Sequence, residues 1–175
     1  AAFQVTSIIT TTGFSTTDFD RWPVFSKTIL LGLMVVGACA GSTGGGFKCG
    51  RILLAVKNMA RSIRQQLYPQ RVQVVRINRQ VVGERVLGNV SAFLTAYALI
   101  LAGSVLIVSL DGFSVETNLS AVLACFNNIG PGLDQVGPMC SFAGYGTVSK
   151  LVLIFDMLAG RLEIFPILAL MAGST

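Results

Sequence analysis

The chain has 175 residues, of which 53% are hydrophobic and only 12% are charged. Soluble domains average about 25% charged residues, so an ordinary soluble enzyme, a disordered chain and a nucleic-acid-binding protein are poor interpretations, and a membrane protein is the first one. The net charge is +5, and nine of the thirteen Lys and Arg residues fall within 48–85. Lys and Arg clustered beside apolar segments mark the cytoplasmic side of a membrane, so we expect 65–85 to form a basic cytosolic linker.

The chain begins with a short apolar segment, 1–12, that ends at Gly13. As a helix this segment is about 18 Å long, too short for a hydrocarbon core of about 30 Å. We therefore predict a half-helix over 1–10 that enters the membrane partway, followed by a turning loop at 11–15. Irregular backbone at that depth is tolerated only where it lines a cavity or is buried by protein.

A helix that returns through the membrane is predicted over 23–64, with a break at Gly41–Gly46. This segment contains Gly41, Ser42, Thr43, Gly44, Gly45 and Gly46. Each glycine costs a helix about 1 kcal/mol relative to alanine, so four of them in six positions argue against a continuous helix. The segment is not a phosphate-binding loop, because Phe47 stands where that motif requires lysine.

The second half of the chain repeats this order. The Val-rich residues 71–82 could form a small cytosolic hairpin, and 86–110 is a full span of 25 uncharged residues. A second half-helix is predicted over 116–127, a second loop over 128–132 and a returning helix over 147–172. Aligning Gly13 with Gly130 gives an offset of 117 residues. The expected fold is an all-α membrane protein built from repeated units of span, pore half-helix and span.

Each loop follows the C-terminal end of a half-helix, where the helix dipole is partly negative. A glycine there permits backbone conformations that turn consecutive carbonyl oxygens to one side. Rings of such oxygens replace the hydration shell of potassium in known filters. The residues expected to supply these oxygens are Thr11, Thr12, Gly13, Phe14, Asn128, Ile129, Gly130 and Pro131.

Four segments together make a specific resemblance: SIITTTGFSTTDFD, GACAGSTGGGFKCGRIL, CFNNIGPG and AGRLEIFP. In this order they resemble the Trk-type potassium uptake transporters, and the TrkH branch more than KtrB. The resemblance implies a third pore repeat without its first span at 1–64, and a complete fourth repeat at 86–175. It also implies potassium as the transported ion, a homodimer in the cytoplasmic (inner) membrane, and a cytosolic nucleotide-binding regulatory partner similar to TrkA.

Arg161 lies within the last apolar segment, where a charge usually faces a polar cavity or a partner. Gly13 to Gly44 and Gly130 to Arg161 are both 31 residues apart, which favours one depth for the glycine loop and the arginine. Our hypothesis is that Gly41–Gly46 and Arg161 together gate the pathway below the loops. A structural ion pair with another helix is the alternative for Arg161.

Other classes of function remain as alternatives. The chain has no histidine, which removes Ser-His and Cys-His catalysis, and we expect no enzyme activity and no organic cofactor. A structural or assembly subunit and a non-selective cation channel are the competing hypotheses. For residues 57–85, contact with the regulatory partner and a solvated loop are both open.

Overall fold

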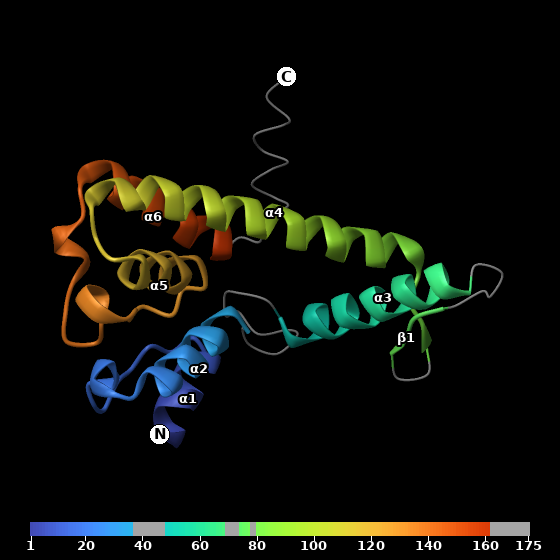
Figure 1. Ribbon diagram of the computed structural model, residues 1–175, viewed down its shortest axis with the longest axis horizontal. Helices are drawn as coiled ribbons and strands as arrows, with labels where there is room; N and C mark the ends of the chain where they lie inside the picture. Colours follow the sequence, from blue (N-terminus) through green and yellow to red (C-terminus); the bar gives the residue numbers. More distant parts are fainter. Residues whose placement is uncertain (37–47, 69–73, 78–79, 162–175) are drawn as a thin grey trace.

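The structure, a computed structural model, describes residues 1–36, 48–68, 74–77 and 80–161. Within these residues the chain is mostly helical, as the sequence predicts (Figure 1). In chain order the elements are α1 (Ala2–Ile9), η1 (Phe19–Arg21), α2 (Val24–Val35), α3 (Cys49–Leu67), β1 (Arg76–Ile77), β2 (Gln80–Val81), α4 (Glu84–Val108), η2 (Ser109–Asp111), α5 (Val115–Phe126), η3 (Asp134–Val136), η4 (Phe142–Gly144) and α6 (Thr147–Arg161).

The longest element is α4, whose 25 residues extend about 37 Å. With η2 it forms a helix over Glu84–Asp111, the one helix in the described residues that is long and apolar enough to cross a membrane. Helices α5 and α6 pack against α4 and against each other (Figure 1). The returning helix predicted over 147–172 begins at Thr147 and is described as far as Arg161, while 162–172 lies outside the described residues.

The short helix α5 has a defined start and end. Ser114 caps its N-terminus by accepting a hydrogen bond from the Thr117 N–H through its side chain, which satisfies one of the unpaired donors of the first turn. The preceding Gly112 has φ +76° with no atom within 4 Å of an added Cβ. This glycine therefore makes a left-handed turn in open space between η2 and α5.

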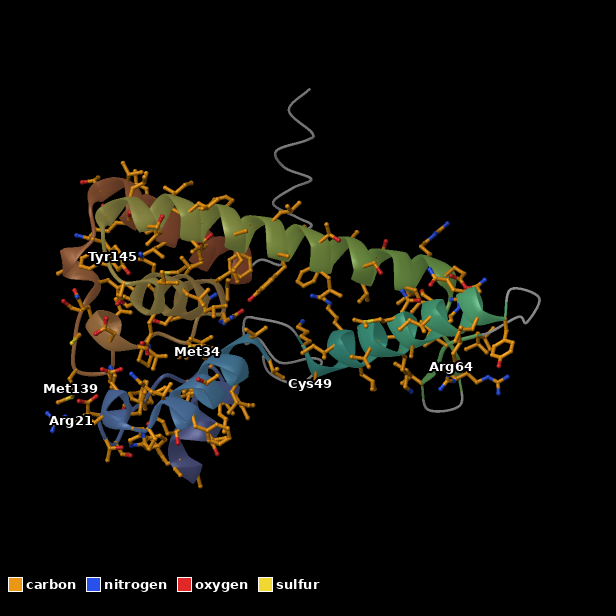
Figure 2. The ribbon with its side chains drawn as sticks, in the orientation of Figure 1. Arg21, Met34, Cys49, Arg64, Met139 and Tyr145 are labelled. Carbon is orange, nitrogen blue, oxygen red and sulfur yellow. The ribbon has the colours of Figure 1, made fainter. Side chains whose placement is uncertain are left out.

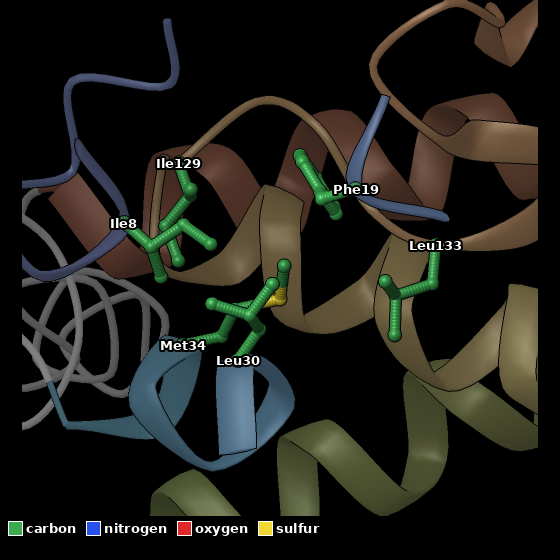
Figure 3. Close-up of a cluster of buried hydrophobic side chains, with 6 residues drawn as sticks. All are labelled: Ile8, Phe19, Leu30, Met34, Ile129 and Leu133. Carbon is green, nitrogen blue, oxygen red and sulfur yellow. The ribbon is translucent and has the colours of Figure 1, made fainter. Parts of the chain in front are cut away.

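The first half-helix and its loop pack on the second through one apolar cluster (Figure 3). Its members are all buried: Ile8, Phe19, Leu30, Met34, Ile129 and Leu133. The first four come from α1, η1 and α2, whereas the last two follow α5. The cluster therefore holds together two segments that are at least 95 residues apart in the sequence.

Helix α3 runs beside the N-terminal part of α4, and the strands lie at its end (Figure 1). An ion pair joins Arg61 to Glu84 at 2.6 Å, and the Arg51 guanidinium lies 4.3 Å from the centroid of the Phe93 ring. Strands β1 and β2 pair antiparallel within the predicted hairpin. The proposed glycine gate Gly41–Gly46 lies outside the described residues.

Candidate functional site: two loops at half-helix ends

The loop after α1 leaves its helix through a left-handed turn. Thr11 has φ +54° and Gly13 has φ +77°. The N–H of Thr11 donates to Ile8 O at 3.1 Å, and the N–H of Thr12 donates to Ser7 O at 2.9 Å. This pair of bonds is the Schellman arrangement that closes many helix C-termini. The chain therefore turns sharply at Thr11.

The loop after α5 leaves its helix in the same way. Asn128 has φ +54° and Gly130 has φ +106°. The N–H of Asn128 donates to Cys125 O at 3.1 Å, and the N–H of Ile129 donates to Ala124 O at 2.9 Å. Each of these residues lies 117 positions after its counterpart in the first loop. The offset suggested by the two glycines thus also relates the helix ends and their hydrogen bonds.

One of these conformations is unusual for its residue type. Asparagine and glycine tolerate positive φ, but a β-branched residue such as Thr11 adopts it rarely. Backbone strain of this kind clusters at functional sites, where the surrounding structure holds it in place. Thr11 and Asn128 therefore share a left-handed backbone conformation. Residue type makes this conformation unsurprising for Asn128, but it does not predict it for Thr11, so the two glycines marked only part of each turn.

The two loops touch each other. A Cβ atom placed on Gly13 would lie 2.0 Å from the Ile129 carbonyl oxygen and 3.2 Å from Cδ of Pro131. Only a residue without a side chain allows this approach. The Ile129 side chain is buried beside Ile8 in the apolar cluster (Figure 3), so the second loop is anchored on the first half-helix.

Most carbonyl oxygens of the two loops receive no hydrogen bond from the described residues. Within the part of the chain that the structure describes, no group donates to the oxygens of Thr11, Thr12, Gly13, Asn128, Ile129, Gly130 or Pro131. Phe14 differs, because its oxygen accepts a hydrogen bond from Ser7 Oγ at 2.7 Å. Seven oxygens of two touching loops are therefore not engaged by the described protein groups and are available to a ligand.

A cavity of about 540 Å³ lies against both loops. Thr11, Thr12 and residues 128–130 form one part of its wall, and α6 forms another through residues that include Lys150 and Met157. Arg161 follows Met157 by four residues, so it lies on the same side of α6. Arg161 is exposed and lies one turn beyond the described residues of α6 that line the cavity.

The second loop is also tied to α6. Asn128 donates through Nδ2 to Met157 O at 3.1 Å. A Cβ atom on Gly160 would lie 1.6 Å from the carbonyl oxygen of Phe126, at the end of α5. Helix α6 therefore approaches the base of this loop as closely as its backbone allows.

Asn127, which the sequence analysis did not select, joins three helices immediately before the second loop. Its side chain is fully buried; it accepts a hydrogen bond from Tyr97 Oη at 3.0 Å and donates through Nδ2 to Met34 O at 2.8 Å. These bonds fasten the end of α5 to α4 and α2. A pair of asparagines ending an apolar helix was the only signal for this role in the sequence.

Asp156 in α6 is a second buried polar group that the prediction did not use as a site. It is fully buried, and one carboxylate oxygen accepts a hydrogen bond from Ser104 Oγ of α4 at 2.7 Å. Its other oxygen has no partner within the described residues. Asp156 thus faces α4, on the side of α6 opposite to Arg161.

A polar network links the segments that follow the two loops. Asp134 accepts hydrogen bonds from Thr117 Oγ1 at 2.6 Å and Ser114 Oγ at 3.0 Å, and its N–H donates to Asp20 Oδ1 at 3.0 Å. Lys27 forms ion pairs with Asp20 at 3.3 Å and with Glu116 at 3.1 Å. The hydrogen bond from Thr117 is the main cause that lowers the pKa of Asp134, so this carboxylate is ionised at neutral pH.

The family profile and the individual proteins that match this chain all point to the same family. The TrkH family profile, described as a cation transport protein, matches residues 1–174. The Trk system potassium uptake protein TrkH of Salmonella typhimurium is 41% identical over 170 residues, which is 97% of this chain and 35% of that protein. Its counterpart in Vibrio parahaemolyticus is 42% identical over 171 residues, covering 98% of this chain and 35% of that protein.

A solved structure agrees with the sequence relatives. The crystal structure of the potassium transporter TrkH from Vibrio parahaemolyticus matches with a TM-score of 0.83 and 40% identity, over 96% of this chain and 36% of that one. The chain thus spans about 35% of the length of the curated relatives it matches. The helical membrane-protein fold predicted from the sequence is confirmed by this match. With the family profile matching almost every residue, the chain belongs to the TrkH family of cation transport proteins.

Proposed function

We propose that this chain supplies two of the strips that surround a dehydrated potassium ion in a transport pathway. The observation that carries the proposal is the set of seven carbonyl oxygens, from two touching loops, that accept no hydrogen bond within the described residues. Carbonyl oxygens in such a ring take the place of the water around potassium. Phe14 belongs to the predicted set, and we assign its oxygen a supporting role because Ser7 already donates to it.

The half-helices add an electrostatic contribution. Both loops begin at the C-terminal end of a helix, α1 or α5, and a helix C-terminus carries about half a negative charge. Two such ends directed at one place attract a cation before any oxygen binds it. We assign 1–64 and 86–175 to two pore repeats and 65–85 to the linker between them.

We also propose that Arg161 acts with Gly41–Gly46 as the gate below the loops. Support comes from its exposed position, one turn beyond the residues of α6 that line the cavity. A positive charge there raises the barrier for a cation. Movement of the glycine segment would lower that barrier.

The relatives support potassium as the ion, since they are named Trk system potassium uptake proteins. By the same resemblance we assign the complete protein to the cytoplasmic (inner) membrane as a homodimer, regulated by a TrkA-like nucleotide-binding subunit. No organic cofactor enters this proposal.

Ion flux tests the proposal directly. The protein expressed from its complete gene is reconstituted into liposomes. Rubidium uptake is measured alone and with excess potassium or sodium, and sodium uptake is measured in parallel. Uptake that potassium suppresses and sodium does not is the expected result. Equal flux of sodium and rubidium would identify a non-selective cation channel instead, and no flux at all would identify a structural subunit.

A further inference from the structure

A second groove lies between α3 and β1, at the opposite end of α4 from the ion loops (Figure 1). It has a volume of about 250 Å³, and four cationic side chains line it: Lys57, Arg61, Arg64 and Arg76. Arg64 is labelled near the end of α3 in Figure 2. The ion pathway proposed above does not use this groove.

The charge of the groove is only partly compensated. Arg61 is paired with Glu84, which is the only acidic residue within 48–85. Lys57 donates a hydrogen bond to the neutral carbonyl of Arg76 at 2.9 Å. Arg64 and Arg76 are both exposed. The groove therefore presents excess positive charge and several N–H donors, which together suit a phosphate group.

The same helix carries an exposed apolar stripe. Its members are Leu53, Val56, Met59, Ile63 and Leu67, which are 46%, 60%, 67%, 50% and 68% exposed. They recur every three or four residues, so they share one face of α3. Arg51 and Arg61, by contrast, point toward α4 through the Phe93 ring and Glu84. The apolar face of α3 is thus turned away from the helix it packs on.

The contacts with α4 give α3 a depth in the membrane. Glu84 is the first residue of the spanning helix, and Phe93 lies nine residues further along it, or about 13 Å deeper. Arg61 is therefore level with the end of the span, and Arg51 is inside it. The stripe begins at the level of the acyl chains, whereas the groove lies at the level of the headgroups. Tyr68 is 63% exposed, and its N–H donates to the carbonyl oxygen of the groove residue Arg64, in the kind of position where aromatic residues gather at membrane interfaces.

We propose that this groove binds the phosphate of an anionic phospholipid whose acyl chains lie along the apolar stripe of α3. Clusters of Lys and Arg at the cytoplasmic end of a transmembrane helix attract anionic lipid, and amphipathic helices bury an apolar face at the same boundary. A protein partner with an acidic surface would satisfy the groove and leave the adjoining stripe uncovered. A lipid satisfies both features at once.

Native mass spectrometry of the purified protein, expressed from its complete gene, tests the site. Bound phosphatidylglycerol is titrated against bound phosphatidylethanolamine in the wild type and in the double variant R64Q/R76Q. Each cation near a membrane surface contributes about fivefold to binding, so we expect the double variant to bind phosphatidylglycerol about 25-fold more weakly. The variant R21Q, which removes a charge from an exposed position outside the groove and far from α3 (Figure 2), should change binding less than twofold.

Two further arms separate the remaining explanations. The variant R64K/R76K keeps the charges and should keep most of the binding, which shows that a loss in R64Q/R76Q is not a folding defect. Glycerol 3-phosphate should not compete with the lipid at equal concentration, since it has no acyl chains. Equal losses in the two glutamine variants, full competition by glycerol 3-phosphate, or unchanged lipid binding with loss of a cytosolic protein would each overturn the proposal. Because lipid binding is measured and not flux, the result is independent of the proposed ion pathway.

Discussion

The contact between the two loops makes Gly13→Ala the most informative substitution. Its Cβ atom would lie 2.0 Å from the Ile129 oxygen, whereas contacts below 3.0 Å essentially do not occur. The loops must therefore separate by at least 1.0 Å, the difference between these two distances. Overpacking of this kind costs about 1–3 kcal/mol, and a positive φ costs alanine a further 1–2 kcal/mol or so.

Gly112→Ala is a matched control, because it carries the backbone cost alone. Gly112 has φ +76°, almost the same as the +77° of Gly13, but no atom lies within 4 Å of its added Cβ. Both variants should lose about 1–2 kcal/mol of stability from strain, and only Gly13→Ala should lose more. The difference between the two variants therefore isolates the contact between the loops.

The measurements are thermal unfolding in detergent with potassium or sodium, and rubidium uptake into liposomes. A ligand that binds only the folded state raises its stability, so potassium should stabilise the wild type and Gly112→Ala more than sodium does. Gly13→Ala should lose that difference together with selective uptake. The reasoning is wrong if Gly13→Ala and Gly112→Ala behave alike in both assays.

Three other variants test neighbouring features. Gly160→Ala places a Cβ atom 1.6 Å from a carbonyl oxygen at the end of α5, so it should lower the unfolding temperature and rubidium uptake. Its control is Gly103→Ala, in open space on α4, which should stabilise the protein by about 0.5–1 kcal/mol. Equal effects of the two variants would refute the close packing of α6 on α5. Thr117→Val removes the main cause of the lowered pKa of Asp134. A lowered folded-state pKa stabilises the protein above the ordinary value, and this stability is lost as pH falls from the ordinary value through the folded one. The variant should therefore be less stable at neutral pH, and its melting temperature should fall less steeply with pH on the acid side; curves of equal slope would contradict this. Arg161→Ala should increase rubidium flux through reconstituted protein, and unchanged flux at equal protein content would remove this residue from the gate.

Apolar segment lengths predicted most of the helices. Segment 1–12 was too short to span, and the structure has α1 at Ala2–Ile9; segment 86–110 was long enough, and α4 occupies Glu84–Val108. These predictions depend only on how many helical residues are needed to cross a membrane and on where glycine interrupts an apolar segment. They are local properties, and a sequence expresses them directly.

The contacts that hold the loops could not be predicted in the same way. Asn127 bonds to Tyr97 and to Met34, residues 30 and 93 positions earlier in the chain. Periodicity says which face of a helix is buried, but it does not say which distant polar group that face meets. The positive φ of Thr11 could not be predicted for a different reason, because threonine disfavours that backbone conformation.

The correspondence between the two loop backbones bears on how internal duplication is detected. Segments 3–13 and 120–130 share few letters, yet their positive φ angles and turn-closing bonds fall in register. On the proposed function, an ion is bound by main-chain oxygens of these loops, so selection at this place would act on torsion angles and leave the side chains free to diverge. A search for internal repeats in such transporters would therefore succeed better by comparing backbone dihedral angles than by comparing amino-acid sequences.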